Sequence, residues 1–196
     1  MHLYGYGQSK RGPSFRVHLD TLLVYHCWPL LYKYMHLNGS EPLGSESGSG
    51  DDASCPKEQS SLRNYELYIP APKYAERGQA FLYHTATRNF FAWLFGKPLV
   101  GVHLGAALTA LLNSMNEFRS LGSDNVRAVL DYMEDEGYAN MGNSPTHALA
   151  ALFFAEHFQF KDLYTDAFAH CTGMHDKLIL SAGFEASTNS LSCQLD

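Results

Sequence analysis

The helical spacing of apolar residues from Ala75 onward is the feature that most limits what this chain can fold into. Apolar side chains recur there every three or four residues, which is the repeat of an amphipathic helix. We therefore expect a mainly α fold, a compact bundle of about five helices. The clearest stripe lies between about Leu99 and Arg119 and consists of Leu104, Leu108, Leu111, Leu112, Met115 and Phe118.

Start and stop signals set the expected limits of these helices. The first helix is expected over about 75–95, with one face formed by Phe81, Thr85, Arg88, Phe91 and Phe95, and with Gly96-Lys97-Pro98 as its end. Ser123 or Asp124 can cap the third helix, which Gly137 ends, and Ser144-Pro145 begins the fourth. A fifth is expected over about 161–172, with Leu163, Ala167, Phe168 and Cys171 pointing inward. Small residues, including Gly105, would let a neighbouring helix approach the second one closely.

The N-terminal region predicts a small β element. His2 to Tyr6 and Ser14 to Leu19 alternate loosely between apolar and polar residues, which suggests two short strands. A helix over 22–37 would be broken at Pro29, because proline lacks a hydrogen-bond donor. A short strand is expected over 65–69, ended by Pro70.

A change in composition suggests the domain boundaries. Between Gly39 and Ser54, 13 of the 16 residues are Gly, Ser, Asp or Glu. Such a segment buries too little apolar surface to offset its backbone entropy, so a disordered linker is expected over 39–61. The expected organisation is an N-terminal arm (1–38), this linker, a helical domain (62–181) and a flexible tail (182–196).

The net charge and the hydropathy of the chain argue against some classes of partner and indicate a cellular location. The formal net charge is −6, which argues against a general grip on nucleic acid or on anionic lipid. The apolar segment 22–37 is too short and too polar to span a membrane. Four cysteines without CxxC spacing indicate reduced thiols. We expect no membrane or nucleic-acid partner, and an intracellular location, cytoplasmic or nuclear.

Histidines and cysteines provide no recognisable metal or catalytic motif. His170 and Cys171 are adjacent on an expected helix and so point about 100° apart, which prevents both from facing one metal ion easily. Cys171 lies near a helix C-terminus, where the dipole disfavours a thiolate. We predict no cofactor, no metal ion and no catalytic residue. The alternative is an enzyme whose pocket is assembled from dispersed residues around His84, Arg88 and His157.

Acidic residues gather at the end of the third expected helix, where the helix dipole is already negative. They are Asp131, Glu134, Asp135 and Glu136. One interpretation is a solvated acidic end, screened by salt. The other is a docking patch for a basic partner, whose binding would relieve the repulsion.

The first expected helix is unusually aromatic. One helix cannot direct all of its aromatic residues into the same core, so either the N-terminal arm covers some of them or they form a partner surface. These residues are Tyr83, Phe90, Phe91, Trp93 and Phe95.

Several segments resemble an uncharacterised fungal domain of unknown function. They include Tyr65-Glu-Leu-Tyr-Ile-Pro-Ala-Pro72, Thr87-Arg-Asn-Phe-Phe-Ala92, Phe95-Gly-Lys-Pro-Leu-Val-Gly101 and Ala169-His-Cys-Thr-Gly-Met174. The resemblance extends over about 62–181, and it implies no activity, cofactor or catalytic residue. The order of elements is also loosely similar to BTB/POZ interaction domains. We therefore expect a noncatalytic protein–protein interaction domain, with a protein partner or self-association.

Overall fold

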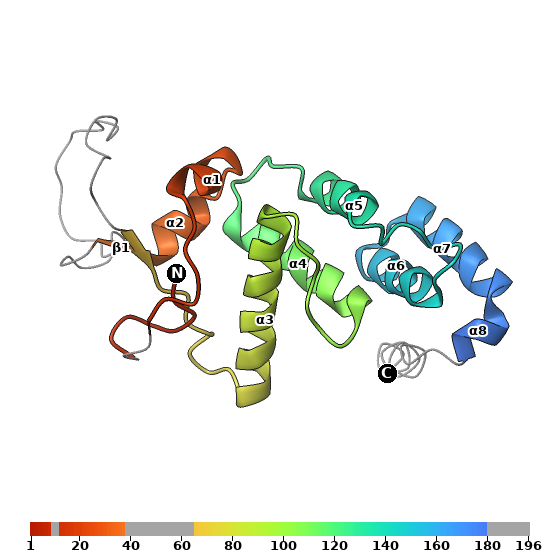
Figure 1. Cartoon of the computed structure of the whole chain (residues 1–196), viewed down its shortest axis with the longest axis horizontal. Coiled ribbons are helices and arrows are strands. Elements are labelled where there is room, and N and C mark those ends of the chain that lie inside the picture. Colours follow the sequence, from red (N-terminus) through yellow and green to blue (C-terminus); the bar gives the residue numbers. More distant parts are fainter. Residues whose placement is uncertain (9–11, 38–64, 180–196) are drawn as a thin grey trace. The chain divides into compact units, whose positions relative to one another are not determined.

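The computed structural model describes residues 1–8, 12–37 and 65–179 (Figure 1). The expected linker at 39–61 and the expected tail at 182–196 lie outside these residues. Within the described part the protein is mainly α-helical and has one small antiparallel sheet, as the sequence predicted. Contacts divide the chain into two units: the first comprises Met1–His84 with Glu117–Ser123, and the second comprises Thr85–Asn116 with Asp124–Asp196.

The first unit begins with two short helices, α1 (Leu19–Val24) and α2 (Trp28–Tyr34). His26 lies between them in the left-handed conformation, with φ 57°. The helix predicted over 22–37 is interrupted, but at residues 25–27, just before Pro29, and its end at 35–37 is a strand instead; Pro29 lies in the first turn of α2. Proline is tolerated there, because the backbone N–H groups of a first helical turn have no hydrogen-bond partner within the helix.

A two-stranded antiparallel sheet follows, formed by β1 (Met35–Leu37) and β2 (Tyr65–Leu67). His2 adds an isolated parallel bridge to Tyr68 beside it. The strands predicted at 2–6 and 14–19 are wrong, because only His2 pairs and Leu19 already begins α1. Strand β2 has three residues and ends shortly before Pro70, so it offers few backbone groups with which the N-terminal residues could pair.

Helix α3 (Arg77–Leu94) passes from the first unit into the second between His84 and Thr85. The face predicted for it is wrong: Phe81 is 69% exposed, Phe95 and Arg88 are also exposed, and only Phe91 of the aromatic residues in that stripe is buried. One stripe cannot describe this helix, because its two halves belong to different units. Its buried residues are Thr87, Asn89, Phe90, Phe91, Trp93 and Leu94.

Three further helices, α4, α5 and α6, follow their sequence signals in the second unit. Four residues of the stripe on α4 (Leu104–Phe118) that fall in this unit, Leu108, Leu111, Leu112 and Met115, are buried as predicted. In α5 (Asn125–Asp135) the side chain of Asp124 accepts the backbone N–H of Arg127 at 2.9 Å. Ser144 caps α6 (Pro145–Phe158) in the same way. Both caps were predicted.

The remaining helices, α7 (Lys161–Gly173) and α8 (His175–Ile179), pack on α6. Ala148, Leu149, Cys171 and Leu178 form their shared buried cluster. Of the residues predicted to point inward, Ala167 and Cys171 are buried, whereas Phe168 is 54% exposed. Since the buried face of α6 is rich in alanine, the two helices approach closely and the small residue of α7 takes the inward position.

Gly105 marks another close helix approach. A Cβ atom at this position would lie 3.0 Å from the Cβ of Phe153 and 3.2 Å from the Cα of Ala150. Helix α4 therefore meets α6 at a distance that only glycine accommodates without a shift, as the small residues predicted. No helix within the three described ranges is long and apolar enough to cross a membrane.

Candidate functional site

The residues of the enzyme hypothesis are divided between the two units. His84 is half-buried and belongs to the first unit, whereas Arg88 and His157 are exposed on the second. Among the described residues no hydrogen bond or ion pair joins Arg88 to His157.

The cysteine and histidine side chains give no metal site in the part of the chain that is described. No three His, Cys, Asp or Glu side chains come together there as a metal ion would require. Cys27 and Cys171 are free, buried thiols. Burial raises the pKa of Cys27 to about 12, and it also raises the pKa of Cys171. Both thiols thus remain protonated at neutral pH and act as small apolar side chains.

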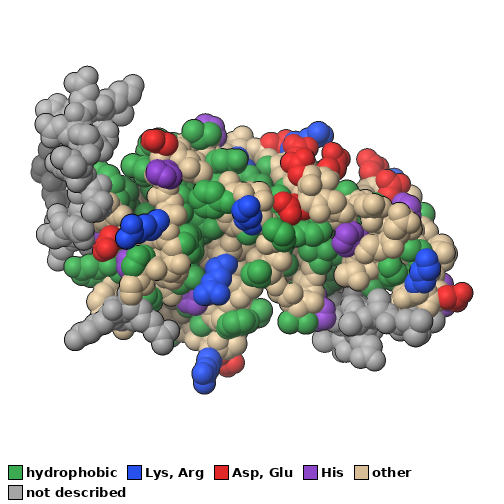
Figure 2. All heavy atoms as spheres, viewed as in Figure 1, with side chains coloured by type: hydrophobic (Ala, Val, Ile, Leu, Met, Phe, Trp, Pro, Cys, Tyr) green, Lys and Arg blue, Asp and Glu red, His purple; other side chains and the backbone are tan. Residues whose placement is uncertain are grey.

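The acidic end of α5 is accessible, as the docking hypothesis requires. Asp131, Glu134 and Asp135 are exposed and Glu136 is half-buried. Figure 2 shows acidic side chains gathered around this helix. Asp131 is engaged within the helix, since its Oδ1 lies 2.8 Å from Nε of Arg127. The other three acidic residues lie at the negative end of the helix dipole.

The connecting loop between α3 and α4, residues 95–103, exposes apolar side chains. Val102 is 91% exposed, and Phe95 and Val100 are also exposed. The loop leaves α3 through Gly96, whose left-handed conformation (φ 54°) lets the N–H of Lys97 bond to the carbonyl of Ala92. Apolar side chains in a loop that faces water call for an explanation, because they gain nothing there from burial.

Asn89 holds the backbone of the connecting loop. Its side-chain amide donates to the carbonyl of Val100 at 2.9 Å and its carbonyl accepts the N–H of Val100, also at 2.9 Å. Asn89 is only 1% exposed, so these two bonds satisfy a buried polar side chain. They also explain why α4 begins at Leu104 and not near Leu99, since the backbone of Val100 is bonded to a side chain of α3.

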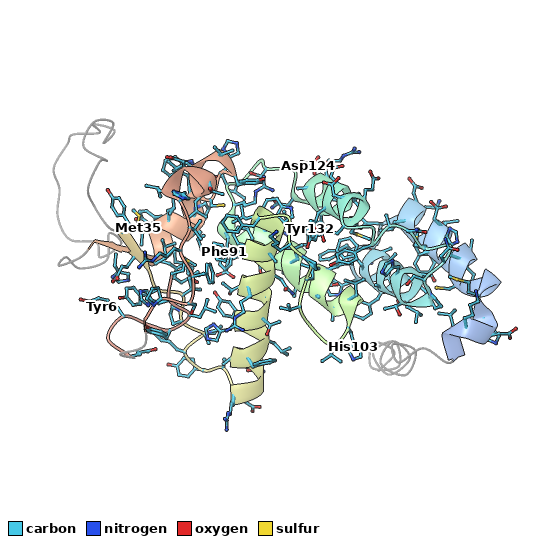
Figure 3. The ribbon with its side chains drawn as sticks, in the orientation of Figure 1. Tyr6, Met35, Phe91, His103, Asp124 and Tyr132 are labelled. Atoms are coloured by element: carbon cyan, nitrogen blue, oxygen red, sulfur yellow. The ribbon has the colours of Figure 1, made fainter. Side chains whose placement is uncertain are left out.

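Two tyrosines also bond to the backbone of the connecting loop. The hydroxyl of Tyr132 on α5 donates to the carbonyl of Lys97 at 2.5 Å, and the hydroxyl of Tyr138 accepts the N–H of Leu99 at 3.0 Å. Figure 3 shows Tyr132 beside α5, and His103 at the place where the loop meets α4. Burial raises the pKa of Tyr132, and the charges of Tyr138 and Glu136 raise it further.

The two tyrosines also support each other. The rings of Tyr132 and Tyr138 meet edge to face with centroids 6.0 Å apart, and the ring of His147 meets Tyr138 in the same way at 5.8 Å. Edge-to-face pairs at such distances are favourable. The connecting loop is thus fixed by a side chain of α3 and by an aromatic row that runs from α5 to the start of α6.

The comparison with family models gives a partial match to a family without a known function. Residues 126–194 match the family described as Domain of unknown function (DUF8004). No curated protein and no solved structure matches the chain. The DUF8004 match covers nearly all of α5 and the helices after it, and so includes the acidic end of α5, Tyr132, Tyr138 and His147. The connecting loop precedes the DUF8004 match.

Sequence reasoning did not single out Asn89, Tyr132 and Tyr138 as a group that holds a loop. A usable signal existed for Asn89, since it stands beside Phe90 and Phe91 on a helix with buried aromatics. A polar side chain in such surroundings needs a hydrogen-bond partner. The partner, Val100, is 11 residues further along the chain and lies in a loop, and no rule of helical or strand spacing predicts such a pair.

Proposed function

We propose that the second unit is a protein–protein interaction domain without a catalytic role, and that its partner docks on the connecting loop. The observation that carries this proposal is the contrast between the backbone and the side chains of the loop. Buried or half-buried side chains bond four backbone groups of residues 97–100, while Val100 and Val102 face solvent.

A loop held in this way is suited to binding. Association costs free energy whenever a flexible segment becomes ordered, and a loop that is already fixed avoids most of this cost. Burying one valine side chain at an interface contributes about 1.5–3 kcal/mol. If the loop served only to connect two helices, polar side chains would be the favourable choice at its exposed positions.

The substitution Val102→Ser tests the proposal. Val102 is so exposed that the folded protein should lose less than about 0.5 kcal/mol. Proteins that bind the wild-type chain in an extract of its native cells would be identified, purified and titrated against both chains. We expect the affinity of the partner to fall at least about tenfold, which corresponds to about 1.4 kcal/mol. Sedimentation at increasing concentration covers the case in which the partner is a second copy.

Val24→Ser is the matched control, because Val24 is a 71% exposed valine of the first unit. This variant should bind like the wild type. The proposal fails if no protein binds the wild-type chain and it does not self-associate, or if both serine variants bind equally well.

A further inference from the structure

The acidic end of α5 adjoins the connecting loop. Tyr132 points from α5 to the loop, where its hydroxyl reaches the carbonyl of Lys97. Asp135 and Glu136 follow Tyr132 by three and four residues, a spacing that places them beside it on the same side of the helix. The influence of the Glu136 charge on the pKa of Tyr132 agrees with this placement. The hydrogen bonds of Tyr132 to Lys97 and of Tyr138 to Leu99 therefore place the first half of the connecting loop beside the acidic end of α5, so that one extended partner segment can reach both.

The acidic charge of this surface is not balanced within the described residues. Arg127 engages Asp131, whereas Glu134, Asp135 and Glu136 form no ion pair there. Lys97 of the connecting loop supplies one exposed positive charge against these three. Each of the three carboxylates also lies at the negative end of the helix dipole, so it destabilises the free protein and would interact favourably with a cation.

We propose that the partner segment of the connecting loop is basic and apolar, with aliphatic side chains that contact Val100 and Val102 and lysine or arginine side chains that contact Glu134, Asp135 and Glu136. This inference rests on the proposed function and adds the chemical class of the partner. Charge complementarity of this kind speeds association and excludes partners of like charge. A second copy of the chain fits poorly, because its formal net charge is −6.

The test uses the full chain and three synthetic probes. The first probe is a short amphipathic peptide of leucine and lysine. In the second, glutamate replaces each lysine, and in the third, serine replaces each leucine. Each peptide carries a fluorophore, and its anisotropy is followed during titration with the protein. We expect only the leucine–lysine peptide to bind tightly, since it alone supplies both kinds of contact.

Two variants separate the two kinds of contact. E134Q/D135N/E136Q should weaken binding of the leucine–lysine peptide at least about tenfold and should raise the melting temperature of the free protein. Val102→Ser should weaken binding to a similar extent and leave the melting temperature unchanged. A variant that binds less well although it is more stable cannot owe its loss of binding to unfolding.

D162N/D166N/D176N is the matched control, because it removes three exposed carboxylates from α7 and α8. Asp162 and Asp176 lie in first helical turns, so this variant should be less stable than the wild type and yet bind the peptide within about twofold.

The inference is overturned if the leucine–lysine peptide does not bind, if the leucine–glutamate peptide binds equally well, or if the control triple variant loses as much affinity as E134Q/D135N/E136Q. In these cases the proposed function still stands as long as Val102→Ser weakens the natural partner. If Val102→Ser affects neither the natural partner nor the peptide, the proposed function fails as well.

Discussion

Two hydrogen-bond networks, one in each unit, are built differently. In the first unit, three donors converge on Oε1 of Glu117: Lys33 Nζ at 3.0 Å, the Tyr34 hydroxyl at 3.1 Å and the Tyr83 hydroxyl at 3.4 Å. In the second unit, Asn89, Tyr132 and Tyr138 bond to backbone groups of a loop.

The first network fixes helices to one another, whereas the second fixes a loop whose side chains face solvent. The Glu117 network joins side chains of α2, α3 and α4, so its bonds fix helices to one another. The bonds of Asn89, Tyr132 and Tyr138 fix only the backbone of the connecting loop, and the side chains of that loop remain available. A network of the second kind is what a docking surface requires.

The largest effect is expected from Asn89→Ala. The substitution leaves the N–H and the carbonyl of Val100 without their partner, and each orphaned group costs about 1–3 kcal/mol. We expect the free energy of unfolding, measured in urea, to fall by about 2–4 kcal/mol. Asn113→Ala replaces an exposed asparagine of α4 and should change it by less than about 0.5 kcal/mol. Equal effects of the two substitutions would show that Asn89 does not hold the loop.

A smaller effect is expected from Glu117→Gln in the first unit. The substitution keeps the shape of the side chain but removes the charge that accepts three donors. Because the Glu117 side chain is 35% exposed, solvent screens the loss, and we expect a destabilisation of about 1–2 kcal/mol. Glu76→Gln, at an exposed position of the same unit, provides the control. If the two variants were equally stable, the Glu117 network would have no architectural role.

Tyr132→Phe sharpens the comparison within the second unit. It removes one hydrogen bond to the connecting loop and keeps the aromatic packing, so the expected loss is about 1 kcal/mol. Tyr74→Phe changes a tyrosine of the first unit that is almost fully exposed, and its effect should be close to zero. A loss no larger than that of Tyr74→Phe would exclude the bond to Lys97 as a support of the loop.

The smallest effect is the dependence of stability on alkaline pH. Burial, in the main, raises the pKa of Tyr34 to about 12, whereas an unfolded tyrosine titrates near pH 10. The unfolded state therefore releases its proton first, so the contribution of Tyr34 is complete below pH 10 and is lost as pH rises toward 12. At pH 10 the loss is about 0.4 kcal/mol. Urea unfolding of Tyr34→Phe at pH 8 and pH 10 should show a correspondingly weaker dependence, and an unchanged dependence would contradict this assignment.

The sequence predicted those elements whose signals are local. The caps at Asp124 and Ser144 and the buried stripe of α4 follow from residues within one or two helical turns. The exposed face of α3 could not be predicted in this way, because the helix crosses from one unit to the other. The outward position of Phe168 depends on how closely α6 approaches α7, which is a property of the packed pair.

In the candidate site, too, only the features that depend on residues adjacent in sequence could be predicted. The acidic residues Glu134, Asp135 and Glu136 are adjacent in sequence, so composition and the helix dipole were enough to suggest a docking patch. The connecting loop could not be recognised, since its supports come from α3, from α5 and from the segment after α5. Only the folded chain brings Asn89, Tyr132 and Tyr138 to the same short segment of backbone, residues 97–100.

Amide hydrogen exchange of Leu99 and Val100, measured by NMR on the full chain, tests the central claim most directly. The N–H of Leu99 donates to Tyr138 and that of Val100 to Asn89, whereas no hydrogen bond from the N–H of Val102 occurs within the described part. If the connecting loop is held before a partner arrives, the amides of Leu99 and Val100 exchange at least about tenfold more slowly than in an unstructured peptide, and that of Val102 exchanges rapidly. If all three amides exchange at the rate of an unstructured peptide, the loop is not held, and the account of a preformed docking surface is contradicted.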